Sequence, residues 1–112
     1  MYKLEYLQTA IDDMNNIVYH ISNKLNNRVA ALNIATAFIK EANNILTFPY
    51  GNPEYTPINK TKFKYHRTKV KNFLMFYNIN EETKTITIVR VLHQKQSINK
   101  LFLDNKELSI NK

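Results

Sequence analysis

Residues 65–93, YHRTKVKNFLMFYNINEETKTITIVRVLH, decide the fold because they contain two long apolar runs joined by a short polar stretch. The runs are Phe73–Ile79 and Thr85–His93, and the NEETK stretch between them is typical of a hairpin turn. The second run is apolar on both faces except at Arg90, which is the pattern of a strand covered on both sides. We therefore predict a β-hairpin whose second strand is the central strand of a sheet.

One further strand is predicted before this hairpin and another at the N-terminus. The run Lys62–Thr68 resembles a strand, and the alternation changes phase over Lys69–Asn72, which indicates a turn. At the N-terminus, the apolar residues Tyr2, Leu4 and Tyr6 alternate with charged residues, as in a short half-buried strand. We expect these segments to complete the sheet.

The region between the N-terminal strand and the lysine-rich strand predicts two helices. Apolar residues recur every three or four positions from Leu7 to Leu25, and a second stripe of this kind runs from Ala31 to Ile45. The pair Asn26-Asn27 separates the stripes, so the helices are predicted to form an antiparallel hairpin. Pro49 ends the second helix, because the residue before a proline disfavours the helical conformation.

This order of elements predicts an α+β fold, in which an N-terminal strand and a helical hairpin pack on a mainly antiparallel, twisted β-sheet. At 112 residues the chain has room for one core. We expect residues 1–96 to form this domain and residues 97–112 to be a C-terminal tail, in which Leu101–Leu103 could anchor a short helix.

Composition excludes several classes of protein. The absence of cysteine rules out disulfides and thiolate metal sites, and the three histidines are scattered, so we expect no metal. The sequence has no glycine-rich phosphate loop, so we expect no cofactor. No apolar stretch reaches the roughly 20 residues that span a bilayer, and no signal core opens the chain, which predicts a cytoplasmic protein without a membrane partner.

The net charge of +7 is unevenly distributed along the chain. Residues 1–59 hold four Lys and Arg against five acids, whereas residues 60–112 hold twelve against four. No acid lies between Lys60 and Asn80. Such asymmetry predicts a surface that faces either a polyanion or an acidic protein, and charge alone does not separate the two.

The densest cations are candidates for binding RNA or a protein partner: Lys60, Lys62, Lys64, Lys69 and Lys71. Lysines on an edge strand also prevent sheets from pairing with one another, which is the structural alternative. In a strand, Lys60, Lys62, Lys64 and His66 would project to one side and Arg67 to the other, so we expect His66 to be an exposed neighbour of cations.

Several motifs in this order resemble the RelE/ParE toxin superfamily of bacterial type II toxin–antitoxin modules. They are the phenylalanine–proline pair that ends the helical hairpin, Tyr65-His66-Arg67, Asn72–Tyr77 and Arg90–His93. The resemblance implies a cytoplasmic toxin that arrests growth and is wrapped by a cognate acidic antitoxin. ParE-like members poison DNA gyrase, whereas RelE-like members enter the ribosome and cut mRNA, and fold membership does not choose between these targets.

The ribonuclease alternative rests on His93 as acid or base and Arg67 as a phosphate ligand. Ribonuclease relatives also carry an arginine in the middle strand, and this sequence has Leu74 at that position, which weakens the nuclease interpretation. The structural alternative for His93 is that it ends the strand and hydrogen-bonds nearby backbone. We therefore favour a ParE-like gyrase inhibitor, with a RelE-like endoribonuclease as the alternative.

Two further residues have both a structural and a functional interpretation. Tyr77 could stack on a base, although its apolar neighbours favour a place in the core. Arg90 needs a partner if it is buried, and either it forms an ion pair, with Glu5 as the expected partner, or it joins Arg67 in a binding site. A third class of function is a basic module that binds nucleic acid or antitoxin without toxic activity.

Overall fold

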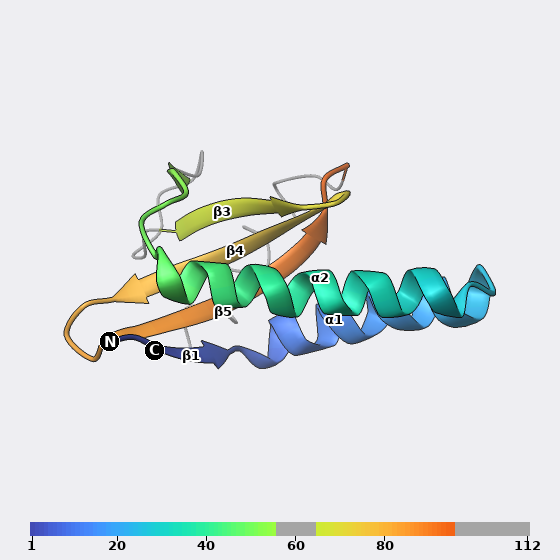
Figure 1. Ribbon diagram of the computed structural model, residues 1–112, viewed down its shortest axis with the longest axis horizontal. Coiled ribbons are helices and arrows are strands. Elements are labelled where there is room, and N and C mark those ends of the chain that lie inside the picture. Colours follow the sequence, from blue (N-terminus) through green and yellow to red (C-terminus); the bar gives the residue numbers. More distant parts are fainter. Residues whose placement is uncertain (56–64, 96–112) are drawn as a thin grey trace.

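The computed structural model of the protein describes residues 1–55 and 65–95, which form one layer of helices on one sheet (Figure 1). The elements in chain order are β1 (Lys3–Tyr6), α1 (Gln8–Tyr19), the π-helical turn η1 (His20–Lys24), α2 (Arg28–Thr47), β2 (Glu54–Tyr55), β3 (Tyr65–Val70), β4 (Phe73–Asn80) and β5 (Thr85–His93). The predicted α+β class, N-terminal strand and helical hairpin are confirmed. No helix in the described part of the chain is long and apolar enough to cross a membrane.

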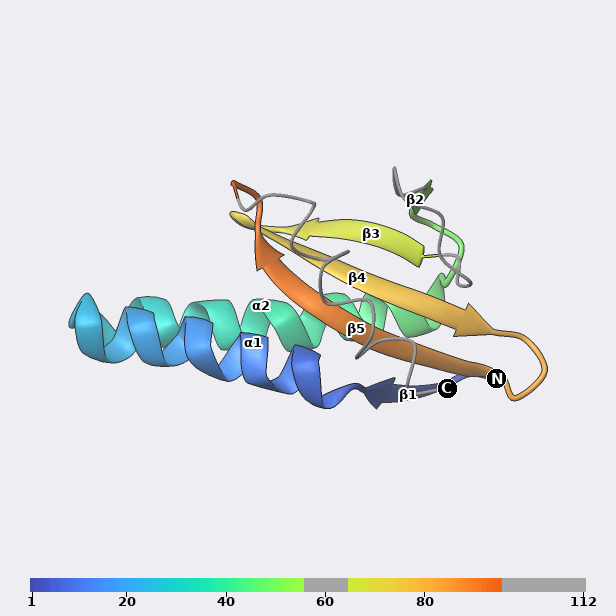
Figure 2. The same ribbon diagram turned by 180° about the vertical axis from the view of Figure 1, so that it is seen from behind.

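The five strands form one sheet in the order β1-β5-β4-β3-β2. β1 pairs with β5 in parallel, and the other three pairs are antiparallel, so the predicted mainly antiparallel sheet is confirmed. β5 is an inner strand, as its apolar composition predicted, but β4 is the middle strand of the five. The two helices lie side by side on one face of this sheet, as the front and back views show (Figures 1 and 2).

The strand before the central hairpin lies further along the chain than predicted. β3 spans Tyr65–Val70, so Lys69 belongs to the strand and not to the turn, and the predicted turn over Lys69–Asn72 is wrong in its first half. Val70 pairs directly with Phe73, which leaves a two-residue loop. Lys62 and its neighbours 56–64 lie outside the described residues.

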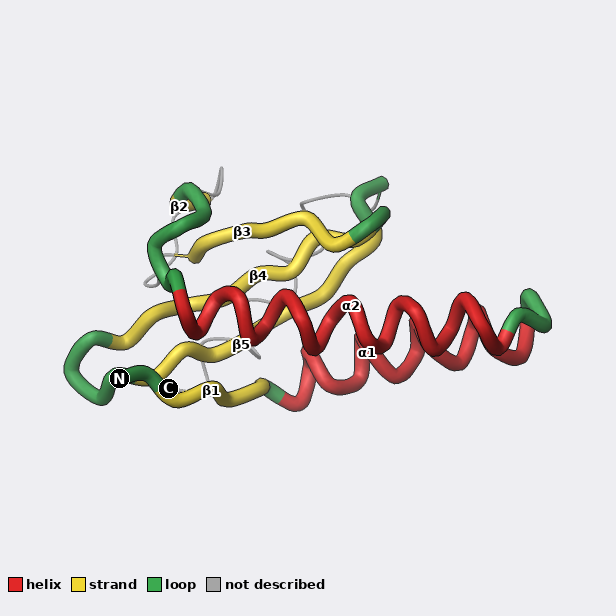
Figure 3. Tube along the Cα trace, in the orientation of Figure 1, coloured by secondary structure: helices red, strands yellow, loops and turns green. Residues whose placement is uncertain are grey.

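The helical hairpin forms where the two stripes were predicted (Figure 3). Asn26 takes a positive φ of 51°, a conformation that asparagine tolerates, and the side chain of Asn27 accepts a hydrogen bond from the backbone of Ala30 at 3.0 Å. This asparagine pair therefore ends the first helical segment and caps the second. The turn η1 directly follows α1 and is wider than an α-helical turn. In it, the backbone amide of Leu25 donates to the carbonyl of His20 at 3.0 Å.

The sheet carries apolar side chains on both faces. Residues of the helices and of the helix-covered face form the larger core: Ala10, Ile34, Phe38, Ile45, Val70, Met75, Tyr77, Ile86, Ile88 and Val91. A smaller cluster, Tyr65, Phe76, Val89 and Leu92, lies on the other face. Val89 is the extra residue of a bulge, since Phe76 pairs with Arg90 and the next residue, Tyr77, pairs with Ile88.

Arg90 forms a buried ion pair with Asp13 of α1. Its Nε and Nη2 atoms donate to the two carboxylate oxygens at 2.8 and 3.1 Å, and the backbone amide of Val91 donates to the same carboxylate at 2.9 Å. Arg90 is 7% exposed. An ion pair was predicted, but the predicted partner, Glu5, is wrong: Glu5 lies exposed on β1.

The first turns of α1 continue the pairing of β5 where β1 ends. The last paired residues of β1 and β5 are Tyr6 and Ile88. Beyond them, the amide of Leu7 donates to the carbonyl of Ile88 at 2.9 Å, and the hydroxyl of Thr9 donates to the carbonyl of Val89 at 2.8 Å. Together with Asp13, these groups satisfy backbone atoms of β5 that a longer β1 would otherwise have bonded.

We predict that Asp13→Ala lowers the free energy of unfolding by about 3 kcal/mol, because it leaves the guanidinium of Arg90 buried without its carboxylate. Urea denaturation of the purified protein measures the change. The double variant Asp13→Leu with Arg90→Met should be distinctly more stable than Asp13→Ala, since it removes both charges together. Equal stability of the two variants would contradict the assigned ion pair.

We also predict that Lys71→Gly raises the free energy of unfolding by about 1 kcal/mol. Lys71 has a φ of 54° at the first position of the two-residue loop, where hairpin turns of this kind prefer glycine. The matched control is Lys69→Gly in the extended part of β3, which should be destabilising. Thermal denaturation of both variants tests the prediction, and a destabilised Lys71→Gly would refute it.

Candidate functional site

The candidate site residues divide between the two faces of the sheet. Directly opposed residues of an antiparallel pair project to the same face, so the register assigns each one. Arg67 pairs with Phe76, and Phe76 pairs with Arg90. Lys69 follows Arg67 by two residues and projects with it, on the face away from the core of the helices. The structure thus brings Arg67, Lys69 and Arg90 to one face.

His93 belongs to the opposite face. It pairs with Phe73, and the two rings contact each other edge to face with centroids 5.3 Å apart. Phe73 in turn contacts Phe38 of α2, at 5.8 Å between ring centroids, so this side of β4 and β5 faces the helices. The amide of Lys95 donates to Nδ1 of His93 at 3.1 Å, as the structural alternative for this histidine predicted.

The arrangement separates the two residues that the ribonuclease alternative requires. Arg67 is exposed on one face of the sheet, and the ring of His93 packs half-buried on the other. An acid–base group and a phosphate ligand must both reach one scissile phosphate, within hydrogen-bonding distance of its oxygens. The described residues do not bring these two side chains to a common site.

Tyr77 belongs to the core, as its apolar neighbours predicted. It is fully buried, and its hydroxyl donates to the carbonyl of Pro49 at 3.0 Å and accepts from the side-chain amide of Asn52 at 3.2 Å. Burial is the main reason that the pKa of Tyr77 is raised. Its ring stacks on His66, with centroids 5.3 Å apart and 19° between the planes. Tyr77 therefore holds the loop after α2 and has no face available for a nucleotide base.

His66 is buried, and the prediction that it is an exposed neighbour of cations is wrong. It is 8% exposed, lies between the rings of Tyr77 and Tyr50, and its Nδ1 is 2.9 Å from the carbonyl oxygen of Asn52. The alternation of β3 was predicted correctly, since Tyr65 and His66 project to opposite faces. The burial of His66 does not follow from the alternation, because it is the loop after α2, at Pro49, that covers this face of β3.

Tyr2, Tyr50 and Lys84 surround the carboxylate of Glu81 at the turn between β4 and β5. The hydroxyl of Tyr2 donates to it at 2.6 Å, the ammonium of Lys84 donates at 2.5 Å, and the hydroxyl of Tyr50 donates as well. The hydrogen bonds from Lys84, Tyr2 and Tyr50 lower the pKa of Glu81 to about 2. The bond to Glu81 likewise raises the pKa of Tyr50 to about 12.

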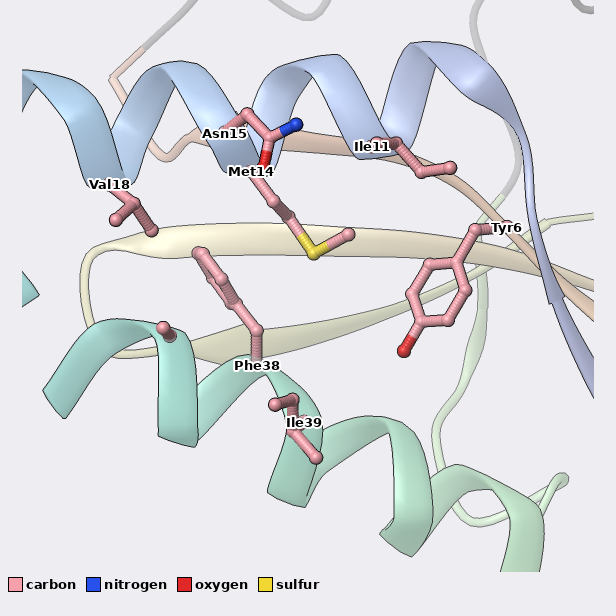
Figure 4. Close-up of a pocket in the computed structure, with 8 residues that line it drawn as sticks. Tyr6, Ile11, Met14, Asn15, Val18, Phe38 and Ile39 are labelled. Atoms are coloured by element: carbon pink, nitrogen blue, oxygen red, sulfur yellow. The ribbon is translucent and has the colours of Figure 1, made fainter. Parts of the chain in front are cut away.

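A groove of about 290 Å³ separates the two helices (Figure 4). Met14 and Val18 of α1 project into it from one side, and Phe38 and Ile39 of α2 from the other, with Tyr6 closing one end. Its lining is apolar except for Asn15 and the hydroxyl of Tyr6. Ile39 is exposed at its rim.

Of the four remaining candidate lysines, the structure describes one. Lys71 is exposed in the loop between β3 and β4, whereas Lys60, Lys62 and Lys64 lie outside the described residues. No cluster of three or more His, Asp or Glu side chains in the described ranges is arranged to hold a metal ion.

Sequence reasoning missed Asp13 and Glu81. From the sequence alone, the charge of Asp13 only favours the start of a helix, although the residue lies in the second turn of α1 and not in the first. Asp13 follows Thr9 by four residues, so the two share a face of the helix, but both lie outside the apolar stripe and therefore resemble solvent-exposed residues. For Glu81, which lies in a turn, the sequence offers no signal either.

We predict that Glu81→Gln lowers stability at neutral pH but not in strong acid. The pKa of Glu81 is lower in the folded chain than its ordinary value of 4.5, so the carboxylate contributes stability above pH 4.5. That contribution is lost as the pH falls toward 2. Urea denaturation should show a difference between wild type and Glu81→Gln at pH 7 that shrinks by pH 3.

The control is Glu82→Gln, which removes an exposed carboxylate that accepts none of these hydrogen bonds. It should leave the free energy of unfolding at pH 7 close to that of wild type, because the hydrogen bonds to Glu81 remain. A difference between wild type and Glu81→Gln that is the same at pH 7 and pH 3 would contradict the assignment.

The fold is that of several solved toxin structures. A chain of the chromosomal ParDE toxin–antitoxin system from P. aeruginosa is 15% identical, with a TM-score of 0.67 over 83% of this chain and 96% of that chain. A chain of the RelBE2 toxin–antitoxin complex from Mycobacterium tuberculosis is 18% identical, with a TM-score of 0.58 over 82% and 96%. The isolated E. coli RelE toxin is 12% identical, with a TM-score of 0.53 over 95% and 98%.

These identities establish the shared fold alone, and the sequence itself decides the family. A comparison with curated protein sequences gives no match. The family model for the ParE toxin of the type II toxin–antitoxin system, parDE, matches residues 4–98. This range includes both helices and all the described strands except Lys3, the first residue of β1. The chain therefore belongs to the ParE toxin family and is the toxin of a type II toxin–antitoxin module.

Proposed function

We propose that the toxin arrests growth by poisoning DNA gyrase and cuts no nucleic acid itself. The observation that carries this proposal is the separation of Arg67 and His93 on opposite faces of the sheet. The family match supports the same branch, because the matching model is that of ParE toxins.

Chemistry on RNA requires more than a basic surface. A general acid or base must reach the reacting oxygen, and fixed positive charge must meet the phosphate in the transition state. Leu74, on the face of Arg67, supplies neither function, and Tyr77 on the other face is fully buried. His93 accepts a backbone hydrogen bond at Nδ1 from Lys95. This contact gives His93 a structural role at the end of β5.

The proposal includes a cognate antitoxin as the second partner. The solved relatives in complex with antitoxins support such a partner. The excess of twelve cations over four acids in residues 60–112 suits an acidic antitoxin segment. We place this toxin domain in residues 1–96, with 97–112 as a tail, and we assign the protein to the cytoplasm, where gyrase and antitoxin both occur.

One observation favours the RelE-like alternative. Arg67, Lys69 and Arg90 share a face, and cations fixed on a sheet are suited to bind the phosphates of an RNA. Arg90, however, already pairs with Asp13. The same face equally suits a basic module that binds nucleic acid without cleaving it.

The decisive experiment is controlled expression of the chain in bacteria, with DNA breakage and mRNA cleavage followed in the same cells. Gyrase poisoning predicts broken DNA with intact transcripts, and a strain with a toxin-resistant gyrase should grow. Cut transcripts with intact DNA would overturn the proposal in favour of the RelE-like alternative. Normal growth with neither lesion would favour the binding module.

We predict that Arg67→Ala and His93→Ala each retain growth arrest to within about threefold of wild type. In a ribonuclease, loss of the acid–base group or of the charge that meets the phosphate costs about 100-fold or more in rate, so both variants would lose toxicity. Co-purification with the antitoxin checks that each variant folds. Loss of toxicity in both folded variants would be evidence for catalysis.

A further inference from the structure

The helical hairpin extends well past the end of the sheet (Figures 1 and 3). The extending part comprises the end of α1, η1 and the first turns of α2. It is built around a π-helical turn, which is rare in proteins and frequent at functional sites. We refer to residues 19–32 as the hairpin tip.

The hairpin tip exposes large apolar side chains that belong to neither of the two core clusters of the described structure. Tyr19, Leu25, Val29 and Leu32 are between 57% and 71% exposed. Val29 and Leu32 lie one helical turn apart and share a face of α2, whereas the buried stripe of this helix contains Ala31 and Ile34. Exposed apolar residues gathered in one place mark interaction surfaces in soluble proteins.

The charge around these residues is of one sign. Residues 14–40 contain no Asp or Glu, and they contain Lys24, Arg28 and Lys40, all exposed. Lys24 and Arg28 lie in the hairpin tip itself. An apolar patch whose charged neighbours are all cations is complementary to an apolar patch bordered by carboxylates. A second copy of this chain would instead oppose cations to cations.

We propose that the hairpin tip is the surface with which the toxin contacts its target, and that it docks on an acidic, apolar patch of a protein. The inference rests on the proposed function, in that it takes the target to be a protein. Four large apolar side chains favour a protein over a nucleic acid, because phosphates would engage the cations but leave the apolar side chains unused.

This surface is distinct from the other candidate sites. It shares no residue with the groove between the helices, whose lining runs from Tyr6 to Val18 on the first strand and helix and from Ala35 to Ile39 on α2. It also shares none with the face that holds Arg67 and Lys69. A change in the hairpin tip therefore separates contact with the target from contacts made elsewhere on the toxin.

The test uses Leu32→Glu, which places a negative charge among the exposed apolar side chains of the hairpin tip. Leu32 itself is exposed. The matched control is Asn43→Glu, which adds the same charge to an exposed position of the same helix, three turns away from Leu32. Both full-length variants are expressed, and growth arrest, DNA breakage in cells and inhibition of purified DNA gyrase are measured. Affinity for the antitoxin checks the fold of each.

We expect Leu32→Glu to weaken growth arrest and gyrase inhibition by at least about tenfold, while Asn43→Glu remains as active as wild type. Arg28→Glu should weaken both activities as well, and Leu32→Gln serves if Leu32→Glu does not fold. If Leu32→Glu and Arg28→Glu both inhibit gyrase as strongly as the wild type, the inference is overturned. The proposed function would then remain intact.

The remaining outcomes are also decisive. If the wild type arrests growth without affecting gyrase, the proposed function fails, and growth arrest alone then tests the hairpin tip. Loss of arrest in Leu32→Glu but not in Asn43→Glu would support a protein target other than gyrase. If Leu32→Glu instead loses binding to duplex DNA or RNA in proportion to its loss of toxicity, the tip contacts nucleic acid and the inference is wrong.

Discussion

The carboxylate of Asp13 joins the helical layer to the sheet, and the rest of the structure depends on this junction. It accepts two hydrogen bonds from the guanidinium of Arg90 and one from the backbone amide of Val91 in the same strand. β1 is only four residues long, so it leaves the far half of β5 without a strand on that side in the described structure. Polar groups of α1 replace the missing strand. They also hold the start of α1 against β5, and the helical hairpin extends past the sheet from there.

Local patterns predicted the elements well because each element is amphipathic over its own length. The helical stripes, the asparagine break and the three long strands follow from spacing alone. The errors arise where distant segments decide. Glu5 and Asp13 are both acids near the N-terminus, and only the packing of α1 along β5 selects Asp13 as the partner of Arg90. His66 alternates as predicted, but its burial is set by a loop that ends α2.

The sequence predicted which residue types could form the candidate site, but it did not predict where those residues lie relative to one another. Arg67 and His93 have the chemistry of a nuclease pair, and they are 26 residues apart in sequence, so their relative position depends on the strand register. The register in turn depends on the two-residue loop at Lys71 and on the bulge at Val89. One fold can support unrelated functions, which is why the surfaces, and not the fold, carry the functional proposal.

The parallel pairing of β1 with β5 has a consequence for how the toxin is made. β1 is completed by β5, the last strand within the described residues, so Leu4 cannot acquire its partner Ile86 until that residue has left the ribosome. Contacts of such long sequence separation form late and slowly. At a synthesis rate of about 5–20 residues per second, the nascent chain spends several seconds without its full sheet. A toxin built in this way cannot complete its sheet until β5 has been made, and an antitoxin has that interval in which to be present.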